Sequence, residues 1–152
     1  MDRFTEKAQQ AIGNAQEIAL RMNHQQVDAE HLHMALLTQE DGLIPKLISY
    51  MGINAGLLIR DVQKELDKLP AVYGSGASEL YATRRLNQVL LQAADEANRF
   101  RDEYTGVEHI YLALLKERGT PSAEIFRKNG INRENFLSAL GKVRSNQRIT
   151  SK

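Results

Sequence analysis

The sequence contains the stretch Asp28-Ala-Glu-His-Leu-His-Met-Ala-Leu-Leu37, and the pattern returns 78 residues later as Gly106-Val-Glu-His-Ile-Tyr-Leu-Ala-Leu-Leu115. The glutamate, the first histidine, the alanine and the final pair of leucines recur at the same places. The same spacing relates Gly52-Ile53-Asn54 to Gly130-Ile131-Asn132, which lie far outside these stretches. A register shared by most of both halves predicts a duplicated structural unit.

Composition sets the class of protein. The chain has 152 residues, of which 42% are hydrophobic and 26% are charged, and this balance is typical of a soluble globular protein with a packed core. The formal net charge of +1 implies no strong attraction to nucleic acid or to an anionic membrane. The sequence has no cysteine, which excludes disulfides and Cys-ligated zinc and fits a reducing cytosol. With no signal-peptide core and no long apolar run, we expect a cytoplasmic protein.

Apolar residues recur at steps of three and four residues in both halves, which is the period of an α-helix. Polar breaks and glycines divide this pattern into four helices in each half, and no segment shows the alternation of a strand. The residues expected to cap helices are Thr5, Asp28, Asn54, Thr83, Thr120 and Asn132. The predicted fold class is therefore all-α, with two pseudo-symmetric four-helix repeats, eight helices in all, forming one compact domain.

The boundaries of the repeats follow from composition. We expect repeat one at residues 1–68 and repeat two at residues 81–145, joined by a loop at residues 69–80. Proline, glycine and serine gather in that loop, and its length is that of a connection within one domain. The polar tail from Arg144 onward is expected to be loose.

Glu30, His31 and His33 form the one pattern that suggests a metal site, because Glu30 and His33 share a helix face. The matching position in the second copy is Tyr111, and the spacing is not the His-Glu-x-x-His arrangement of zinc enzymes. We therefore expect no metal, and we interpret His31 and His109 as hydrogen-bonded or solvated groups near helix starts. A stand-alone metal-dependent enzyme is the least favoured hypothesis.

Glu30 and Glu108 lie in the first turn of their predicted helices, where a carboxylate can satisfy free backbone amides and the positive end of the helix dipole. Thr105-x-x-Glu108 also has the spacing of a capping box. The functional alternative is that Glu108 and Asp102 offer an acidic edge to lysine, arginine or backbone amides of a partner. The sequence leaves both interpretations open.

No motif in the sequence indicates a nucleotide-binding site or a catalytic centre. Gly74-Ser-Gly-Ala-Ser78 is followed by no Lys-Ser or Lys-Thr pair, so it does not match a phosphate-binding loop. No nucleophile-elbow motif surrounds its serines. We expect no catalytic residue and no enzyme activity in this chain.

Six segments together resemble the amino-terminal domain of Clp ATPases. They are Asp2-Arg3-Phe4-Thr5, Glu30-His31-Leu32, Gly52-Ile53-Asn54, Leu69-Pro70, Val107-Glu108-His109-Ile110 and Val143-Arg144-Ser145-Asn146-Gln147-Arg148. The resemblance covers nearly the whole chain, and the doubled motif is specific to the family. Within the family, the tail and the Leu69-Pro70 pair are more similar to ClpB-type protein disaggregases than to ClpC-type proteins.

This resemblance implies a role that composition and spacing cannot show. The parent would be a hexameric, ring-forming AAA+ ATPase that unfolds aggregated proteins together with the DnaK chaperone system, using ATP and magnesium in modules outside this sequence. Residues 1–145 would be its non-catalytic, cofactor-free substrate-recognition domain, a monomer when isolated. Residues 146–152 would begin the flexible linker to the ATPase modules.

The resemblance also implies site residues. Thr5, Asp102 and Glu108 match family positions linked to substrate handling, and Leu90 matches a leucine in an apolar groove. Glu30 occupies the equivalent place in the first copy and is a possible second site. The implied function is weak, reversible capture of exposed apolar segments of misfolded or aggregated proteins, because apolar attraction is non-directional and tolerates many sequences.

An adaptor-docking or phosphoarginine-binding domain of a ClpC-type unfoldase is the alternative function. In that group the two glutamates recognise phosphorylated arginine and adaptors. Here Ala29 and Val107 precede Glu30 and Glu108 where threonine is expected. This departure counts against phosphoarginine binding.

Overall fold

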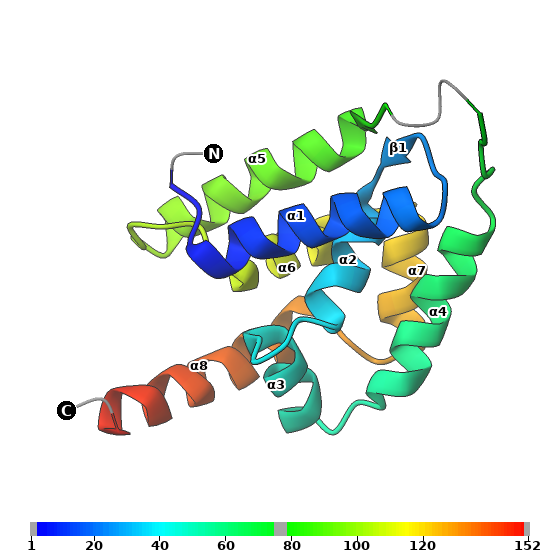
Figure 1. Cartoon of the computed structure of the whole chain (residues 1–152). Coiled ribbons are helices and arrows are strands. Elements are labelled where there is room, and N and C mark those ends of the chain that lie inside the picture. The colour runs from blue at the N-terminus through cyan, green and yellow to red at the C-terminus, as the bar shows by residue number, and fades with distance from the viewer. Residues whose placement is uncertain (1–2, 75–78, 151–152) are drawn as a thin grey trace.

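The computed structural model describes residues 3–74 and 79–150, with side chains as far as residue 145, so part of the predicted loop at 69–80 lies outside the described residues. The described residues form eight α-helices (Figure 1), as predicted. In repeat one they are α1 (Glu6–Arg21), α2 (Ala29–Leu37), α3 (Leu43–Tyr50) and α4 (Ala55–Asp67). In repeat two they are α5 (Arg84–Arg99), α6 (Val107–Lys116), α7 (Pro121–Lys128) and α8 (Arg133–Thr150).

The two repeats keep the sequence register in three dimensions, since each helix of repeat two begins 78 residues after its counterpart. Their caps correspond too. The Thr5 hydroxyl oxygen accepts from the Ala8 N–H at 3.1 Å, and the Thr83 hydroxyl oxygen accepts from the Leu86 N–H at 3.0 Å. The predicted caps Asp28, Asn54, Thr120 and Asn132 also accept from backbone amides near the starts of their helices. The duplicated unit is therefore confirmed.

The expectation that the chain has no strand is wrong at one place. β1 (Gln26–Val27) pairs in parallel with β2 (Tyr81–Ala82), which links the first repeat to the segment that opens the second. A two-residue strand is too short to show the alternation by which strands are recognised in a sequence. Within the described part of the chain this is the only pair of strands.

A second backbone pairing between the repeats mirrors the β1–β2 pair, and we call each of these two pairings a crossing. Phe4 forms an isolated parallel bridge with Thr105, and each of these residues lies 78 positions from a residue of the β1–β2 pair. The Thr5 N–H donates to the Thr105 carbonyl at 3.0 Å, and the Thr83 N–H donates to the Val27 carbonyl at 3.0 Å. The repeats thus exchange equivalent backbone hydrogen bonds, as a pseudo-twofold arrangement requires.

The core is shared by the two repeats. α2 is buried at all nine of its residues, and α6 lies beside it as the second central helix. α1 packs on α2 and α5 packs on α6, while α3 contacts α6 and α8, and α4 contacts α7. In Figure 1, α1 and α5 run side by side on one face of the molecule. The buried apolar residues of both repeats form one cluster, so the chain folds as a single domain.

The last helix is longer than expected. α8 continues to Thr150, whereas the polar sequence predicted a loose tail from Arg144 onward. The extent of the domain and the start of a linker at residue 146 stay predictions. Among the described residues, no helix combines the length and the apolar character needed to cross a bilayer.

His33 and Tyr111 meet where the two repeats face each other. They occupy equivalent positions 78 residues apart, and the His33 Nε2 lies 2.8 Å from the Tyr111 hydroxyl. Both side chains are fully buried. A buried polar group needs a hydrogen-bond partner, and here each repeat supplies the partner for the other.

We predict that Tyr111→Phe lowers the free energy of unfolding by about 1–3 kcal/mol, because it leaves the buried His33 Nε2 without its partner. Urea unfolding followed by circular dichroism measures this change. Tyr104→Phe is the matched control, since Tyr104 is exposed and its hydroxyl is free to bond water. Equal stability of the two variants would contradict the role assigned to this contact.

Candidate functional site

Helix α6 begins with a histidine capping box. Its N-cap residue is Gly106, and the Nδ1 of His109 accepts from the Gly106 N–H at 2.8 Å. The expected capping box between Thr105 and Glu108 is therefore not formed, because the helix starts one residue later and Thr105 bonds to the first repeat instead. The carboxylate of Glu108 is left available for other contacts.

The ring of His109 links this cap to Asp102. Because Nδ1 accepts a hydrogen bond, the network assigns the ring proton to Nε2, which donates to Asp102 Oδ2 at 2.8 Å. In repeat one, His31 accepts from the Asp28 N–H at 2.9 Å and its Nε2 lies 2.8 Å from His24 Nδ1. Both histidines are thus buried, hydrogen-bonded residues near helix starts, as interpreted from the sequence.

Arg144 joins Asp102 to Glu108. Its Nη2 atom lies 3.2 Å from Asp102 Oδ2 and 2.7 Å from Glu108 Oε2. The guanidinium carbon is 6.0 Å from the centre of the Phe100 ring. One nitrogen makes both contacts, and the arginine side chain stays 34% exposed. Burial lowers the pKa of Arg144, but its contacts with the two carboxylates raise it more.

Three of the four predicted substrate-binding residues therefore lie at one end of the molecule. The N–H of Thr5 reaches the Thr105 carbonyl, one residue before the N-cap of the helix that carries Glu108. Asp102 and Glu108 share Arg144. We call Asp102, Glu108 and Arg144 the acidic cluster. It lies where the start of α1 meets the end of α5 and the start of α6.

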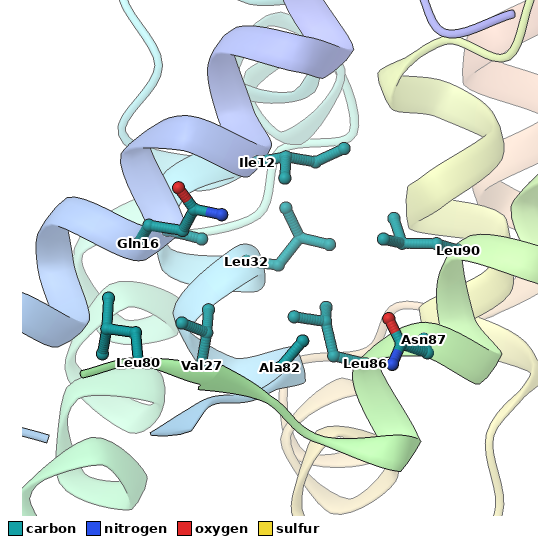
Figure 2. A pocket seen from close by; sticks show the side chains of 10 residues that line it. Ile12, Gln16, Val27, Leu32, Leu80, Ala82, Leu86, Asn87 and Leu90 are labelled. Atoms are coloured by element: carbon teal, nitrogen blue, oxygen red, sulfur yellow. The ribbon is translucent and has the colours of Figure 1, made fainter. Parts of the chain in front are cut away.

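The fourth residue, Leu90, lies elsewhere. It lines an apolar crevice of about 150 Å³ between α1 and α5. Figure 2 shows Ile12 and Leu90 on opposite walls, with Leu32 of α2 between them. The lining includes neither Asp102 nor Glu108. Leu90 precedes Arg99, the last residue of α5, by nine residues, or roughly 14 Å along the helix axis. Asp102 lies beyond that end, so the acidic cluster and the crevice are separate sites.

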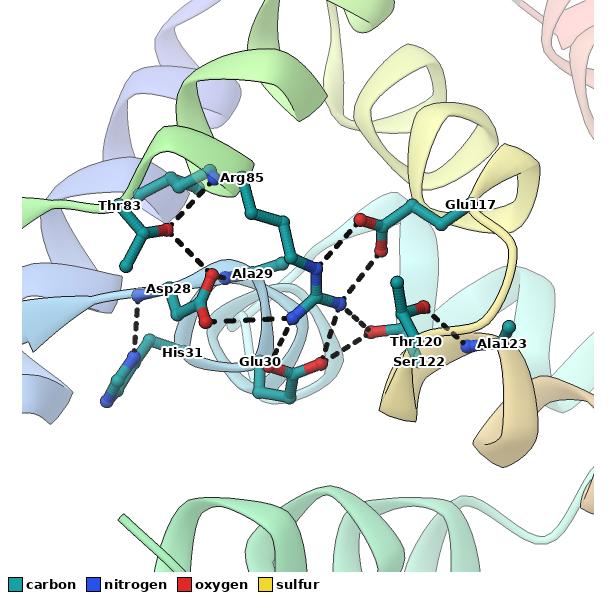
Figure 3. Close-up of polar contacts among 11 residues, drawn as sticks. Asp28, Ala29, Glu30, His31, Thr83, Arg85, Glu117, Thr120, Ser122 and Ala123 are labelled. Atoms are coloured by element: carbon teal, nitrogen blue, oxygen red, sulfur yellow. Dashed lines mark hydrogen bonds and ion pairs between the residues drawn. The ribbon is translucent and has the colours of Figure 1, made fainter. Parts of the chain in front are cut away.

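Glu30, the predicted second site, has a different environment from Glu108. The Arg85 guanidinium binds its carboxylate through two nitrogens, Nη1 at 2.7 Å and Nη2 at 2.8 Å. Ser122 donates to Glu30 Oε2 at 2.9 Å, and Arg85 also binds Glu117 (Figure 3). The Glu30 side chain is 7% exposed. Burial alone raises its pKa, but the hydrogen bonds and charge of Arg85 lower it.

Sequence differences between the repeats explain this asymmetry. The residue 78 positions before Arg85 is Lys7, which donates to the Glu40 carbonyl at 3.0 Å and not to Glu108. The residue 78 positions before Arg144 is Leu66, which is fully buried. The sequence assigns neither arginine a binding role. The Arg84-Arg85 pair is interpreted from the sequence as part of a solvated face, and this is wrong for Arg85, whose side chain is only 22% exposed and is paired with Glu30 and Glu117. A comparison of equivalent positions in the two repeats would identify Arg144, because it stands where repeat one has a core leucine, Leu66.

The possible metal ligands of repeat one do not converge. The carboxylate of Glu30 faces Arg85, the ring of His31 faces His24, and the ring of His33 faces Tyr111. Among the described residues, no three histidine, aspartate or glutamate side chains are placed to hold one ion. The hypothesis of a metal-dependent enzyme built on these three residues therefore loses its geometric basis.

Comparison with known proteins points to one family. Residues 3–129 match the Clp repeat (R) N-terminal domain family. The chain is 46% identical to the chaperone protein ClpB of Nitratidesulfovibrio vulgaris, over 98% of this chain and 18% of that protein. It is 42% identical to ClpB of Clostridium perfringens, over 99% of this chain and 18% of that protein. It therefore spans less than a fifth of the length of these relatives.

A solved structure has the same fold. The N-terminal domain of Hsp104 from Candida albicans superposes with a TM-score of 0.78 at 24% sequence identity, covering 93% of this chain and 91% of that one. This likeness supports the eight-helix architecture independently of the sequence match.

We predict that Arg85→Met and Arg144→Met differ sharply in stability. Arg85→Met leaves a carboxylate buried without its partner and is expected to lower the free energy of unfolding by about 3–5 kcal/mol. Arg144→Met breaks a partly exposed pair, and we expect a loss of at most about 1 kcal/mol. Urea unfolding of both variants makes the comparison. A similar loss of unfolding free energy in both variants would contradict the distinction between the buried ion pair of Glu30 and the partly exposed ion pair of Glu108.

The buried histidines make stability depend on pH. Burial is the main cause that lowers the pKa of His31 from 6.5 to about 4 and that of His33 from 6.5 to about 3. As pH falls below 6.5, the unfolded chain binds protons at these rings before the folded chain does. The stability that these neutral rings confer is therefore complete above pH 6.5 and declines as pH falls toward 4.

We predict a lower urea midpoint at about pH 5 than at about pH 7.5. This window lies above the usual titration range of carboxyl groups, so it reports mainly on histidine. His31→Gln removes one of these rings and should show a smaller difference between the two conditions. Identical midpoints for the native chain would show that protonation of the buried rings is not coupled to unfolding.

Proposed function

Because this chain belongs to the Clp repeat N-terminal domain family, we propose that it is the substrate-recognition domain of an ATP-dependent chaperone. In this role it weakly binds exposed apolar segments of misfolded or aggregated proteins. The observation that supports this proposal is the apolar crevice between α1 and α5, which is found in a chain similar to ClpB chaperones.

The size of the crevice supports weak binding. A volume of about 150 Å³ accommodates little more than one side chain. Full burial of one large apolar side chain contributes about 1.5–3 kcal/mol, and association also costs translational and rotational freedom. Binding at this crevice is therefore reversible, which suits a domain that must pass its client onward. The attraction depends on apolar area and not on a particular sequence.

The acidic cluster is proposed to act beside the crevice. Asp102 and Glu108 hold Arg144 through a single nitrogen, so a lysine or arginine near an apolar client segment can compete for the same carboxylates. Thr5 lies next to this cluster through its bond to Thr105. We propose that these groups contact the client's basic or backbone groups and do not provide the main binding energy.

The proposed parent is the hexameric ATPase implied by the resemblance, acting with the DnaK system in the cytoplasm. Nucleotide and magnesium would be bound outside this domain, which would be non-catalytic and without a cofactor. The support is the match to ClpB proteins, of which this chain spans 18%. The linker would begin near residue 146, where α8 approaches its end.

Adaptor docking or phosphoarginine binding is the less supported alternative. It relies on the two glutamates, and Glu30 is occupied on both oxygens by Arg85. Glu108 is more accessible, with 16% of its side chain exposed. Any second site at Glu30 would first require the Arg85 ion pair to open. A titration with phosphoarginine that perturbs α6 would favour this alternative.

We predict that an unfolded client, such as a reduced and alkylated protein, shifts the NMR signals of Leu90 and of residues around the crevice. Leu90→Asn should weaken binding about tenfold, because it removes apolar area from one wall. Leu91→Asn is the matched control, since Leu91 is 70% exposed on the same helix and does not line the crevice.

Two results would contradict the proposal. One is a set of shifts that misses both the crevice and the acidic cluster. The other is equal weakening by the two leucine variants, since general surface hydrophobicity would then explain binding. Binding to a folded adaptor without binding to unfolded chains would favour the alternative function.

A further inference from the structure

The two crossings between the repeats hold side chains of different size at equivalent places. Beside Val27, the extended segment at β2 carries Ala82, which lines the crevice. Beside Thr105, the extended segment before α1 carries Phe4. Ala82 and Phe4 are 78 residues apart, and the backbone hydrogen bonds of the two crossings correspond. We call the place where each crossing meets the start of its helix, α1 or α5, a corner of the fold. One corner therefore has a methyl group where the other has a phenyl ring.

Phe4 is held in the core at its corner. Its residue is 9% exposed and belongs to the buried apolar cluster. Ala8, four residues further on, is fully buried, and its equivalent at the other corner is the larger Leu86. The two corners thus carry different side chains at equivalent positions, Phe4 with Ala8 and Ala82 with Leu86. At the second corner a crevice stays open.

The crevice has the size and lining for an aromatic ring. Its volume is about 150 Å³, and an apolar protein cavity of about 150 Å³ is known to bind benzene. Leucine, isoleucine, valine and alanine form most of its lining. Gln16 on α1 and Asn87 on α5 add one amide group on each side (Figure 2). An amide both donates and accepts hydrogen bonds, so it can pair with the backbone of any client.

We propose that the crevice binds one phenylalanine side chain of an extended client segment, and that Ala82 determines this specificity by keeping the crevice open. The inference rests on the proposed function and names the client group that the site selects. The chain's own Phe4 is the precedent, because it is an aromatic side chain on an extended segment, buried at the equivalent corner. A residue larger than alanine at position 82 occupies the space that the client ring needs.

The first test uses a small probe and requires no client protein. N-acetyl-phenylalanine amide, titrated onto the intact chain, is expected to shift the methyl signals of Leu32, Leu86 and Leu90. N-acetyl-alanine amide, the matched probe without the ring, should leave them unchanged. Equal responses to the two probes, or shifts elsewhere, would overturn the inference whether or not unfolded proteins bind.

The second test changes position 82. Ala82→Phe fills the crevice from within and is expected to weaken binding of the probe and of an unfolded client by about tenfold or more. Ala82→Ser keeps a small side chain and should bind as the native chain does. A client segment in which one phenylalanine is replaced by alanine should lose affinity for the native chain to a similar degree.

The outcomes separate this inference from the proposed function. If the native chain binds clients but Ala82→Phe binds them equally well, the role of Ala82 is wrong and client recognition stands. If the ring probe enters the crevice but no unfolded client binds, the proposed function fails and the ring site stands. Circular dichroism checks the fold of Ala82→Phe. If that variant does not fold, the two probes and the paired client segments decide.

Discussion

Neither central helix has a face that can be left in water. All nine residues of α2 are buried, and in α6 the exceptions are Glu108 and the last two residues. A single four-helix unit would expose much of this surface, so neither repeat can bury its apolar residues alone. The His33–Tyr111 hydrogen bond has the same consequence, because each buried group finds its partner in the other repeat. The single core follows from this mutual dependence.

Divergence between the repeats then creates the surface features. Arg85 binds both oxygens of the Glu30 carboxylate through two nitrogens. The equivalent residue of the other repeat, Lys7, donates to the Glu40 carbonyl, and Glu108 binds Arg144 instead. Phe4 fills one corner, and Ala82 leaves the equivalent corner open. A symmetric backbone thus carries a buried ion-pair cluster around Arg85, a partly exposed one around Arg144, and one crevice. These differences trace to a few pairs of residues at equivalent positions.

Much of the fold could be predicted from the sequence because its signals are local or periodic. Helix caps such as Thr5 and Thr83 act within one turn, and the repeat register fixes which helices correspond. The β1–β2 pair could not be predicted, since it is formed by two residues from each repeat. The partners of Glu30 and Glu108 also depended on tertiary packing, because Arg85 and Arg144 lie 55 and 36 residues away from them. The sequence and the resemblance named Leu90 and Asp102 without showing that they belong to separate sites.

The connection between the repeats does more than join two copies of a gene segment. Leu80, the last residue of the 69–80 loop, and Ala82 of β2 form part of the crevice wall, so the crevice is built partly from the junction itself. The pairing of β2 with β1 holds this wall against the first repeat. If the crevice binds clients as proposed, residues that lie outside every helix take part in that binding.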